Sequence, residues 1–170
     1  MYFITFSVVE WVDVFSRSLY ADIVIESLCY CQQYKGLVIY AYCIMSNHVH
    51  LIVSRSGEQT LSEILQDFKK YTAVKILKEI DHVAESRKSW FLWIFKSTGK
   101  RNSNNKVYQF WQQDNHPEEL ISNQFMDQKL DYLHNNPVVA GIVDEPEHYR
   151  YSRARNYAGQ KGLLAVAFLE

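Results

Sequence analysis

Two strand-like runs with only two residues between them constrain the fold of this chain most. Residues 37–45 (LVIYAYCIM) and 48–54 (HVHLIVS) are rich in β-branched and aromatic residues, which favour strands. The short connection at residues 46–47 (SN) predicts that the two runs form a hairpin and pair antiparallel.

The second run places two histidines on one face. Alternate residues of a strand point to the same side, so His48 and His50 project together while Val49 and Leu51 project to the opposite side. Neutral imidazole is a common ligand of divalent metals, which makes the pair a candidate metal site. Ordinary packing or hydrogen bonding is the more common explanation of an isolated His-x-His, and two ligands do not complete a site.

The remaining patterns predict one strand and several helices. Residues 2–9 read as a strand, and apolar residues at helical spacing predict a helix from about Ser18 to Gly36. Thr60 and Glu63 have capping-box spacing at the start of a long helix. Further expectations are a short helix over residues 86–95, a loop over 101–106, a strand over 107–111 and a helix over 122–137. 

The last helix is expected to end at residue 135 or 136, because Pro137 lacks an amide proton and disfavours a helical residue before it. The order strand, helix, strand, strand, helix predicts an α+β fold, with a mainly antiparallel sheet and helices packed on one face. A length of 170 residues fits a single domain, residues 1–170.

Composition is that of a folded globular protein, with 48% hydrophobic and 22% charged residues. No apolar run reaches the roughly 18–20 residues of a membrane span, so no membrane association and a cytoplasmic location are expected. Three cysteines without a C-x-x-C pair suggest neither a disulfide framework nor a thiolate zinc site.

Basic residues concentrate in the middle third of the chain. Clustered cations attract phosphates, so Lys69, Lys70, Lys100 and Arg101 are candidate nucleic-acid contacts. A solvated helix face followed by a polar loop is the alternative explanation. The nearby aromatic residues of WFLWIF, residues 90–95, fit base stacking but at this density are more typical of a core.

Tyr132 and Asn136 offer further polar groups on the last long helix. They are four residues apart and therefore share a helical face. Asn136 could give a metal its amide oxygen, with the Tyr132 hydroxyl one turn away. A C-terminal cap at Asn136 and a half-buried aromatic at Tyr132 are the structural alternatives.

Four blocks, CIMSNHVHLIV, FWQQDNHP, DYLHNNPVVAGIV and YSRARNYAG, follow one another along nearly the whole chain. Together they closely resemble the REP-associated tyrosine transposases, bacterial relatives of the single-strand insertion-sequence transposases. The resemblance implies an HUH endonuclease fold with a ferredoxin-like central antiparallel sheet. His48 and His50 would bind Mg²⁺ or Mn²⁺, Tyr132 would be the nucleophile, and Asn136 would replace the glutamine that many insertion-sequence relatives carry.

The same resemblance implies a substrate of single-stranded DNA that carries palindromic hairpin repeats. Attack by Tyr132 would give a 5′-phosphotyrosine link and a free 3′-hydroxyl, and reversal would rejoin strands. Insertion-sequence relatives work as dimers that exchange the tyrosine, whereas REP-associated members can act alone. Both a monomer and a homodimer therefore stay open.

Two departures from the family pattern bear on these expectations. The segment QQDNHPEEL at residues 112–120 replaces an aromatic and acidic stretch, so its DNA contacts cannot be transferred. Ser46 stands where a proline commonly precedes the Asn-His pair, and we expect only a local effect on the hairpin.

The general base and two other functions stay open. His134 lies two residues from Tyr132 on another helical face, His116 lies in a loop, and neither is assigned. The chain could instead be a catalytically idle DNA- or RNA-binding regulator, which the four candidate site residues disfavour. A metal-dependent hydrolase would use bound water and be indifferent to Tyr132.

Overall fold

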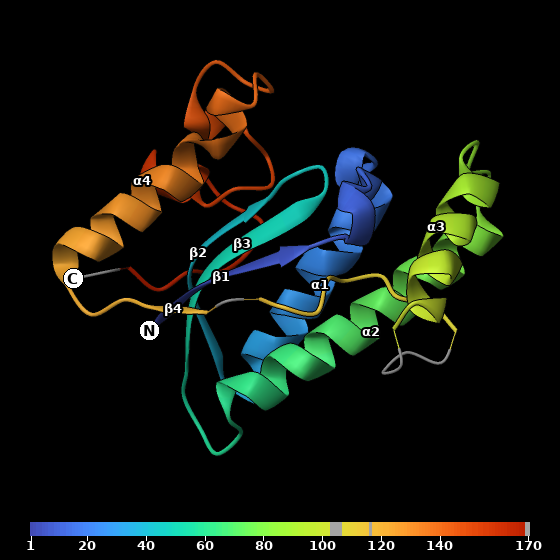
Figure 1. Ribbon diagram of the computed structural model, residues 1–170. Helices are drawn as coiled ribbons and strands as arrows, with labels where there is room; N and C mark the ends of the chain where they lie inside the picture. Colours follow the sequence, from blue (N-terminus) through green and yellow to red (C-terminus); the bar gives the residue numbers. More distant parts are fainter. Residues whose placement is uncertain (103–106, 116, 169–170) are drawn as a thin grey trace.

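The computed structural model describes residues 1–102, 107–115 and 117–168 (Figure 1). The strands and α-helices are, in chain order, β1 (Tyr2–Ser7), α1 (Ser18–Lys35), β2 (Leu37–Ile44), β3 (His48–Arg55), α2 (Leu61–His82), α3 (Lys88–Lys100), β4 (Glu118–Glu119), α4 (Asn123–Val139) and α5 (Ala154–Tyr157). Three 3-10 turns, η1 (Val9–Trp11), η2 (Val14–Ser16) and η3 (Pro146–His148), connect them.

The strands form one antiparallel sheet in the order β2-β3-β1-β4. With α1 between β1 and β2, and α2 between β3 and β4, this is the ferredoxin-like arrangement of two split βαβ units. The α+β class, the antiparallel sheet and the β2–β3 hairpin predicted from the sequence are confirmed. A backbone hydrogen bond from Met45 N to His48 O closes the hairpin.

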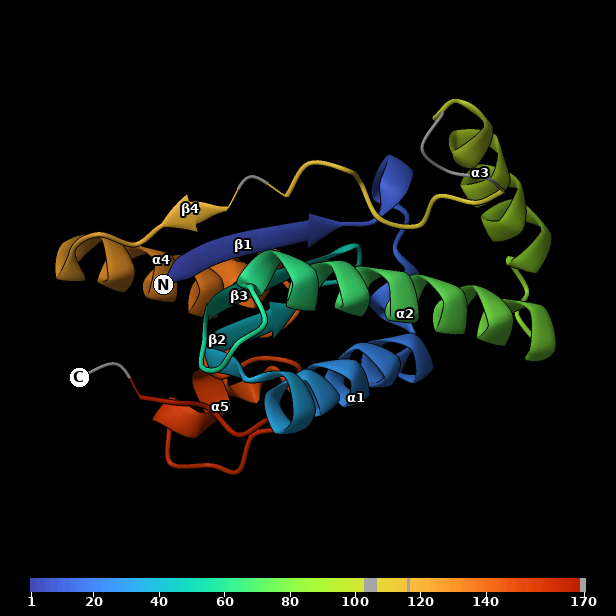
Figure 2. The same ribbon diagram turned by 90° about the horizontal axis from the view of Figure 1, so that it is seen from below.

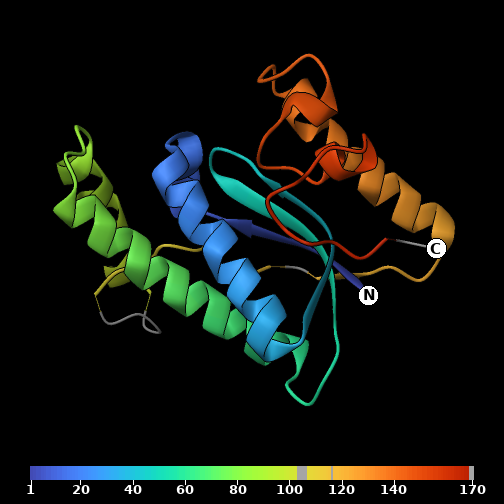
Figure 3. The same ribbon diagram turned by 180° about the vertical axis from the view of Figure 1, so that it is seen from behind.

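Strand alternation divides the apolar side chains between the two faces of the sheet. On one face Ile4, Phe6 and Leu51 pack with the apolar sides of α1 and α2 in the larger core. On the other, Phe3 and Ile52 pack with α4 in a smaller core, whose buried members are Phe3, Ala41, Cys43, Met45, Ile52, Leu120 and Leu133. Figures 2 and 3 show the sheet between the α1–α2 pair and α4. The prediction of helices on one face therefore describes α1 and α2, while α4 covers the second face.

Local signals set the end of α1 and the start of α2, the two helix ends that flank the hairpin. Gly36 ends α1 with a left-handed φ of 71°, as the glycine predicted. Thr60 caps α2 by accepting a hydrogen bond from the Glu63 amide, and the Glu63 carboxylate accepts from the Thr60 amide in return. The predicted capping box is thus confirmed.

The strand predicted over residues 107–111 is wrong. Its described part makes a single β-bridge, between Trp111 and Val8, at the point where β1 ends. Phe110 and Trp111 are buried in the larger core. Backbone hydrogen bonds from Val9 N to Phe110 O and from Gln112 N to Ser7 O hold the segment at the end of β1, so it does not extend as a strand along β1. The edge of β1 pairs with β4 at Tyr2 and Phe3.

Two helix boundaries also differ from prediction. The helix predicted over residues 86–95 begins two residues later and continues to Lys100. α4 continues through Pro137 to Val139. Burial of Leu133 and Pro137 outweighs the hydrogen bond that the proline cannot donate, so the helical turn is kept. The cap is Ala140, which means that Asn136 is not a C-terminal cap.

No helix within the described ranges is both long enough and apolar enough to cross a bilayer.

Candidate active site

The histidine pair lies on the sheet face that α4 covers. In the β1–β3 register His50 stands opposite Thr5, and His48 opposite Ser7. The two imidazole rings are 4.6 Å apart between centroids. Burial lowers the pKa of both, and that of His50 falls to about 3 with smaller contributions from the charges of His48 and Lys129. Both rings are therefore neutral at pH 7, the form that binds metals.

Asn47 fixes the proton of His48. Its Nδ2 donates to the carbonyl oxygen of Trp11 at 3.3 Å, which turns Oδ1 toward His48 Nδ1 at 2.6 Å. An amide oxygen only accepts, so His48 Nδ1 carries the hydrogen and donates it. The lone pair of His48 is consequently on Nε2, where it is available to a ligand.

Asn136 and Thr5 fix the proton of His50 in the same way. The Asn136 amide donates from Nδ2 to His50 Nε2 at 3.2 Å, so that nitrogen is unprotonated. His50 Nδ1 then donates to Thr5 Oγ1, 2.8 Å away. Both histidines thus have the tautomer that presents Nε2 as a ligand.

The donors fit a divalent metal when Asn136 is included. The parts of the chain that the structure describes hold no cluster of three or more His, Cys, Asp or Glu suited to a metal. A half-turn of the Asn136 amide would direct Oδ1 to a bound metal, while Thr5 Oγ1 would still accept from His50 Nδ1 and leave Nε2 unprotonated. The donors would then be two imidazole nitrogens and one oxygen. Amide oxygen suits Mg²⁺ and Mn²⁺, and imidazole is a general ligand of divalent transition ions.

Tyr132 lies beside this group, one helical turn before Asn136. Its ring centroid is 5.3 Å from that of His50 and 6.1 Å from that of Phe3. The side chain is 51% exposed and borders a surface cavity of about 440 Å³ that Asn136 also lines. The half-exposed phenol next to the partly exposed His48 and the buried His50 is accessible to a large substrate.

Lys129 brings a positive charge to the same place. Its ammonium lies 4.5 Å from the centroid of the Phe3 ring and pairs with Glu118 of β4 at 2.8 Å. It stands three residues before Tyr132, on the same side of α4. Sequence reasoning missed Lys129, Asn47 and Thr5. Helical spacing could have found Lys129, whereas Thr5 needed the β1–β3 register.

His134 and His116 are the two histidines that the sequence left unassigned as general base. His134 packs against Tyr157 of α5, with 5.0 Å between ring centroids. Burial, followed by the nearby Arg153, lowers its pKa to about 4. His116 falls outside the described residues.

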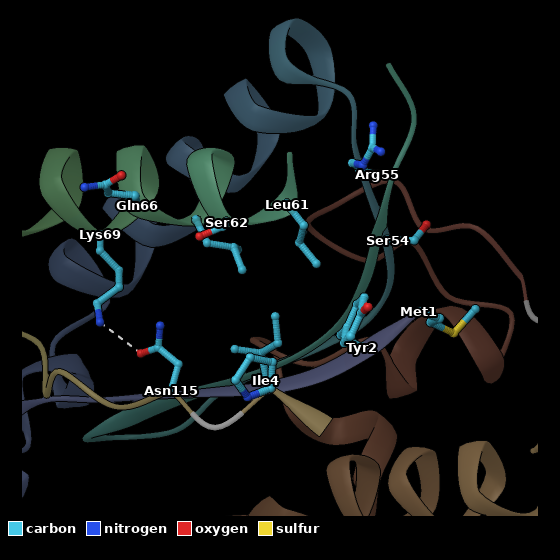
Figure 4. A pocket seen from close by; sticks show the side chains of 12 residues that line it. Met1, Tyr2, Ile4, Ser54, Arg55, Leu61, Ser62, Gln66, Lys69 and Asn115 are labelled. Atoms are coloured by element: carbon cyan, nitrogen blue, oxygen red, sulfur yellow. Dashed lines mark hydrogen bonds between the residues drawn. The ribbon is translucent and has the colours of Figure 1, made fainter. Parts of the chain in front are cut away.

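The four candidate phosphate contacts are spread over the molecule. Lys69 points from α2 into a cavity of about 900 Å³ and donates to Asn115 Oδ1 at 2.9 Å and to Gln112 O at 2.8 Å (Figure 4). Lys70 and Lys100 are exposed. Arg101 is exposed at the end of α3, 3.7 Å from the Glu10 carboxylate of η1. Lys69 therefore holds the 112–115 loop, and Arg101 stands next to the turn that adjoins His48.

The aromatic residues of α3 divide between core and surface. Phe91 and Phe95 are fully buried, as a core assignment predicted. Trp90 and Trp93 are exposed.

The sequence was compared with models of known protein families. Residues 1–116 match the family model described as IS200-like transposase. This chain belongs to the IS200-like transposase family. The matched range contains His48 and His50 and ends before α4, so Tyr132 and Asn136 lie beyond it.

A solved structure gives independent support for the fold. It is a REP-associated tyrosine transposase bound to a REP hairpin, with a TM-score of 0.65 and 16% identity over 99% of this chain and 87% of the other. A search of curated proteins found no match. Family and fold together identify a transposase that acts on DNA and do not favour a regulatory binding module.

Proposed function

We propose that this transposase cleaves and rejoins single-stranded DNA beside a hairpin, with Tyr132 as nucleophile and with His48, His50 and Asn136 as ligands of a divalent metal. One observation carries the proposal: α4 brings Tyr132 and Asn136 to the face of the sheet from which the histidines project. The fixed tautomers of both histidines support their role as ligands.

Mg²⁺ or Mn²⁺ bound by these three residues would supply positive charge that polarises the scissile phosphate. Asn47 and Thr5 would hold the imidazoles in the ligand tautomer. Lys129 would add a second positive charge near the phosphate, at a distance set by its pairing with Glu118.

Tyr132 would attack phosphorus through its phenolic oxygen. The bond from phosphorus to the 3′-oxygen breaks, the 3′-oxygen takes up a proton in place of the one lost from the phenol, and a 5′-phosphotyrosine remains. Attack by a 3′-hydroxyl on this link reverses the step and joins strands without nucleotide hydrolysis. The half-exposed position of Tyr132 suits both directions, because the DNA can approach from solvent.

The test is covalent capture of DNA. The protein is incubated with Mn²⁺ or Mg²⁺ and labelled single-stranded DNA that carries the repeats flanking its own gene, and the products are separated on a denaturing gel. We expect a metal-dependent protein–DNA band that Tyr132→Phe abolishes. Tyr71→Phe is the matched control, because Tyr71 is 53% exposed, against 51% for Tyr132, and lies on α2.

Two results would contradict the proposal. DNA binding without the covalent band, across both metals and several flanking sequences, would indicate a regulatory binding module. Metal-dependent cleavage that survives in Tyr132→Phe would mean that Tyr132 is not the nucleophile, as a hydrolase that uses metal-bound water requires.

A further inference from the structure

The turn η1 is strained at two residues. Glu10 and Trp11 have φ of 52° and 54°, and they are the non-glycine residues with positive φ in the described ranges. A left-handed conformation is unfavourable for an L-residue, because Cβ approaches the following carbonyl oxygen. Neighbouring contacts hold the turn in place: Val9 N donates to Phe110 O, and the Asn47 side chain donates to Trp11 O.

The Trp11 side chain is exposed, so burial of the indole does not explain the strained backbone. The indole is 59% exposed, and it stands edge-on to His48 with 6.5 Å between ring centroids. Exposing a large aromatic ring forgoes hydrophobic stabilisation, and the backbone conformation adds a further cost. Two features that oppose stability coincide next to a candidate catalytic residue, which is typical of a binding role.

A small cavity of about 340 Å³ adjoins the indole. It is lined by Val9, Glu10, Trp11, Thr98, Gln109, Gln112 and Gln113. The Gln109 amide is engaged by Asn102 and by the carbonyl oxygen of Trp111. Gln113 is exposed, and within the described ranges its amide makes no hydrogen bond. A primary amide can donate and accept at once, as the edge of a nucleobase requires.

Positive charge lies at the rim of this cavity. Arg101 pairs with Glu10 at 3.7 Å, and its side chain is 73% exposed. An exposed pair at this distance is weak, so a phosphate could replace the carboxylate as partner of the guanidinium. An aromatic face, a free amide and a cation next to one another are the elements of single-strand recognition.

We infer that Trp11 and its adjoining cavity form a subsite for one unpaired nucleobase, that of a nucleotide next to the scissile phosphate. The base stacks on the indole, the Gln113 amide contacts its edge, and Arg101 contacts the phosphate. The inference rests on the proposed function, because that function places the scissile phosphate at His48.

Binding is measured in the Tyr132→Phe background, so that cleavage does not interfere, by fluorescence anisotropy of a labelled single strand with the flanking hairpin repeats. Trp11→Gly removes the indole ring, and glycine adopts the left-handed backbone conformation without strain. We expect affinity to fall roughly tenfold, since a stacked base contributes on the order of 1–3 kcal/mol. The urea midpoint should stay equal or rise, and Trp11→Phe should retain most of the affinity.

Tyr34→Ala is the control, because Tyr34 is 70% exposed near the end of α1, on the far side of the sheet. Abasic sites placed at successive positions of the strand locate the base. At one position, the abasic site should reduce the affinity of the protein with Trp11 intact about as much as Trp11→Gly reduces it, and it should cause no further loss of affinity in Trp11→Gly. If the two losses of affinity are additive at every position, the inference is wrong.

The failures of the two proposals are distinguishable. A covalent adduct formed by the wild type, with affinity unchanged in Trp11→Gly, would overturn the subsite and leave the proposed function intact. Binding that depends on Trp11 without any adduct would support the subsite and contradict cleavage. Failure to bind any of the single strands would overturn the subsite.

Discussion

At the scale of single residues, the sequence indicated the ligands and not the groups that orient them. Strand alternation predicted that His48 and His50 share a face, and helical spacing predicted the same for Tyr132 and Asn136. The proton positions depend on Asn47, whose orientation is set by the carbonyl oxygen of Trp11. That contact joins residues 36 positions apart, so no local pattern reveals it.

Asn47→Ala should weaken Mn²⁺ binding at least tenfold, because His48 loses the acceptor that keeps its Nδ1 protonated. Electron paramagnetic resonance of free Mn²⁺ during titration measures the affinity without any DNA. Asn135→Ala is the control, since Asn135 is exposed on α4 and, within the described ranges, its side chain donates only to the Asp131 carbonyl oxygen. Equal affinities for the two variants would contradict the role of Asn47.

At the scale of elements, predictions held where the signal is local and failed where packing decides. The capping box of α2 and the glycine after α1 are determined by residues within one turn. The path of residues 107–111 depends on burial of Phe110 and Trp111 against β1 and η2. Similarly, α4 passes Pro137 because its buried face packs on the sheet, a contact that the proline rule does not include.

Gly36→Ala should destabilise the protein by about 3 kcal/mol. Alanine adopts φ of 71° with strain, and its Cβ would overlap the backbone oxygen of Ser56, which the chain cannot easily move. Gly159→Ala is the matched control, because Gly159 has φ of 73° and nothing lies within 4 Å of the added Cβ, so it should cost only about 1 kcal/mol. Urea unfolding measures both, and equal costs would show that the Ser56 contact is unimportant.

At the scale of the whole molecule, the site exists because one sheet has two different faces. The sequence predicted the antiparallel sheet and the helices α1 and α2, which bury its larger core. It did not predict that α4 returns to the opposite face, because the smaller core combines residues from β1, β2, β3 and α4 that are far apart in the chain. This return of α4 places the tyrosine at the histidines.

Stability should fall as the pH drops from 6.5 to 5. The pKa of His50 is lowered to about 3 and that of His134 to about 4, so the unfolded chain takes up protons in this window and the folded chain does not. Each histidine should cost about 2 kcal/mol at pH 5 relative to pH 7.5. Urea midpoints at pH 7.5 and 5 test this, and His134→Gln should show a smaller drop than the wild type. An identical drop would contradict the contribution of His134.

A single chain should contain a complete active site. Tyr132 and His50 of one chain have ring centroids 5.3 Å apart, so no exchange of α4 between subunits is needed to join them. Mixing Tyr132→Phe with a His48→Ala, His50→Ala double variant should therefore not restore the covalent adduct. A dimer with exchanged tyrosines would recover activity in the mixture, because one site would combine an intact tyrosine with intact histidines. Recovery would mean that the contact between α4 and the histidines forms between two chains in the active enzyme.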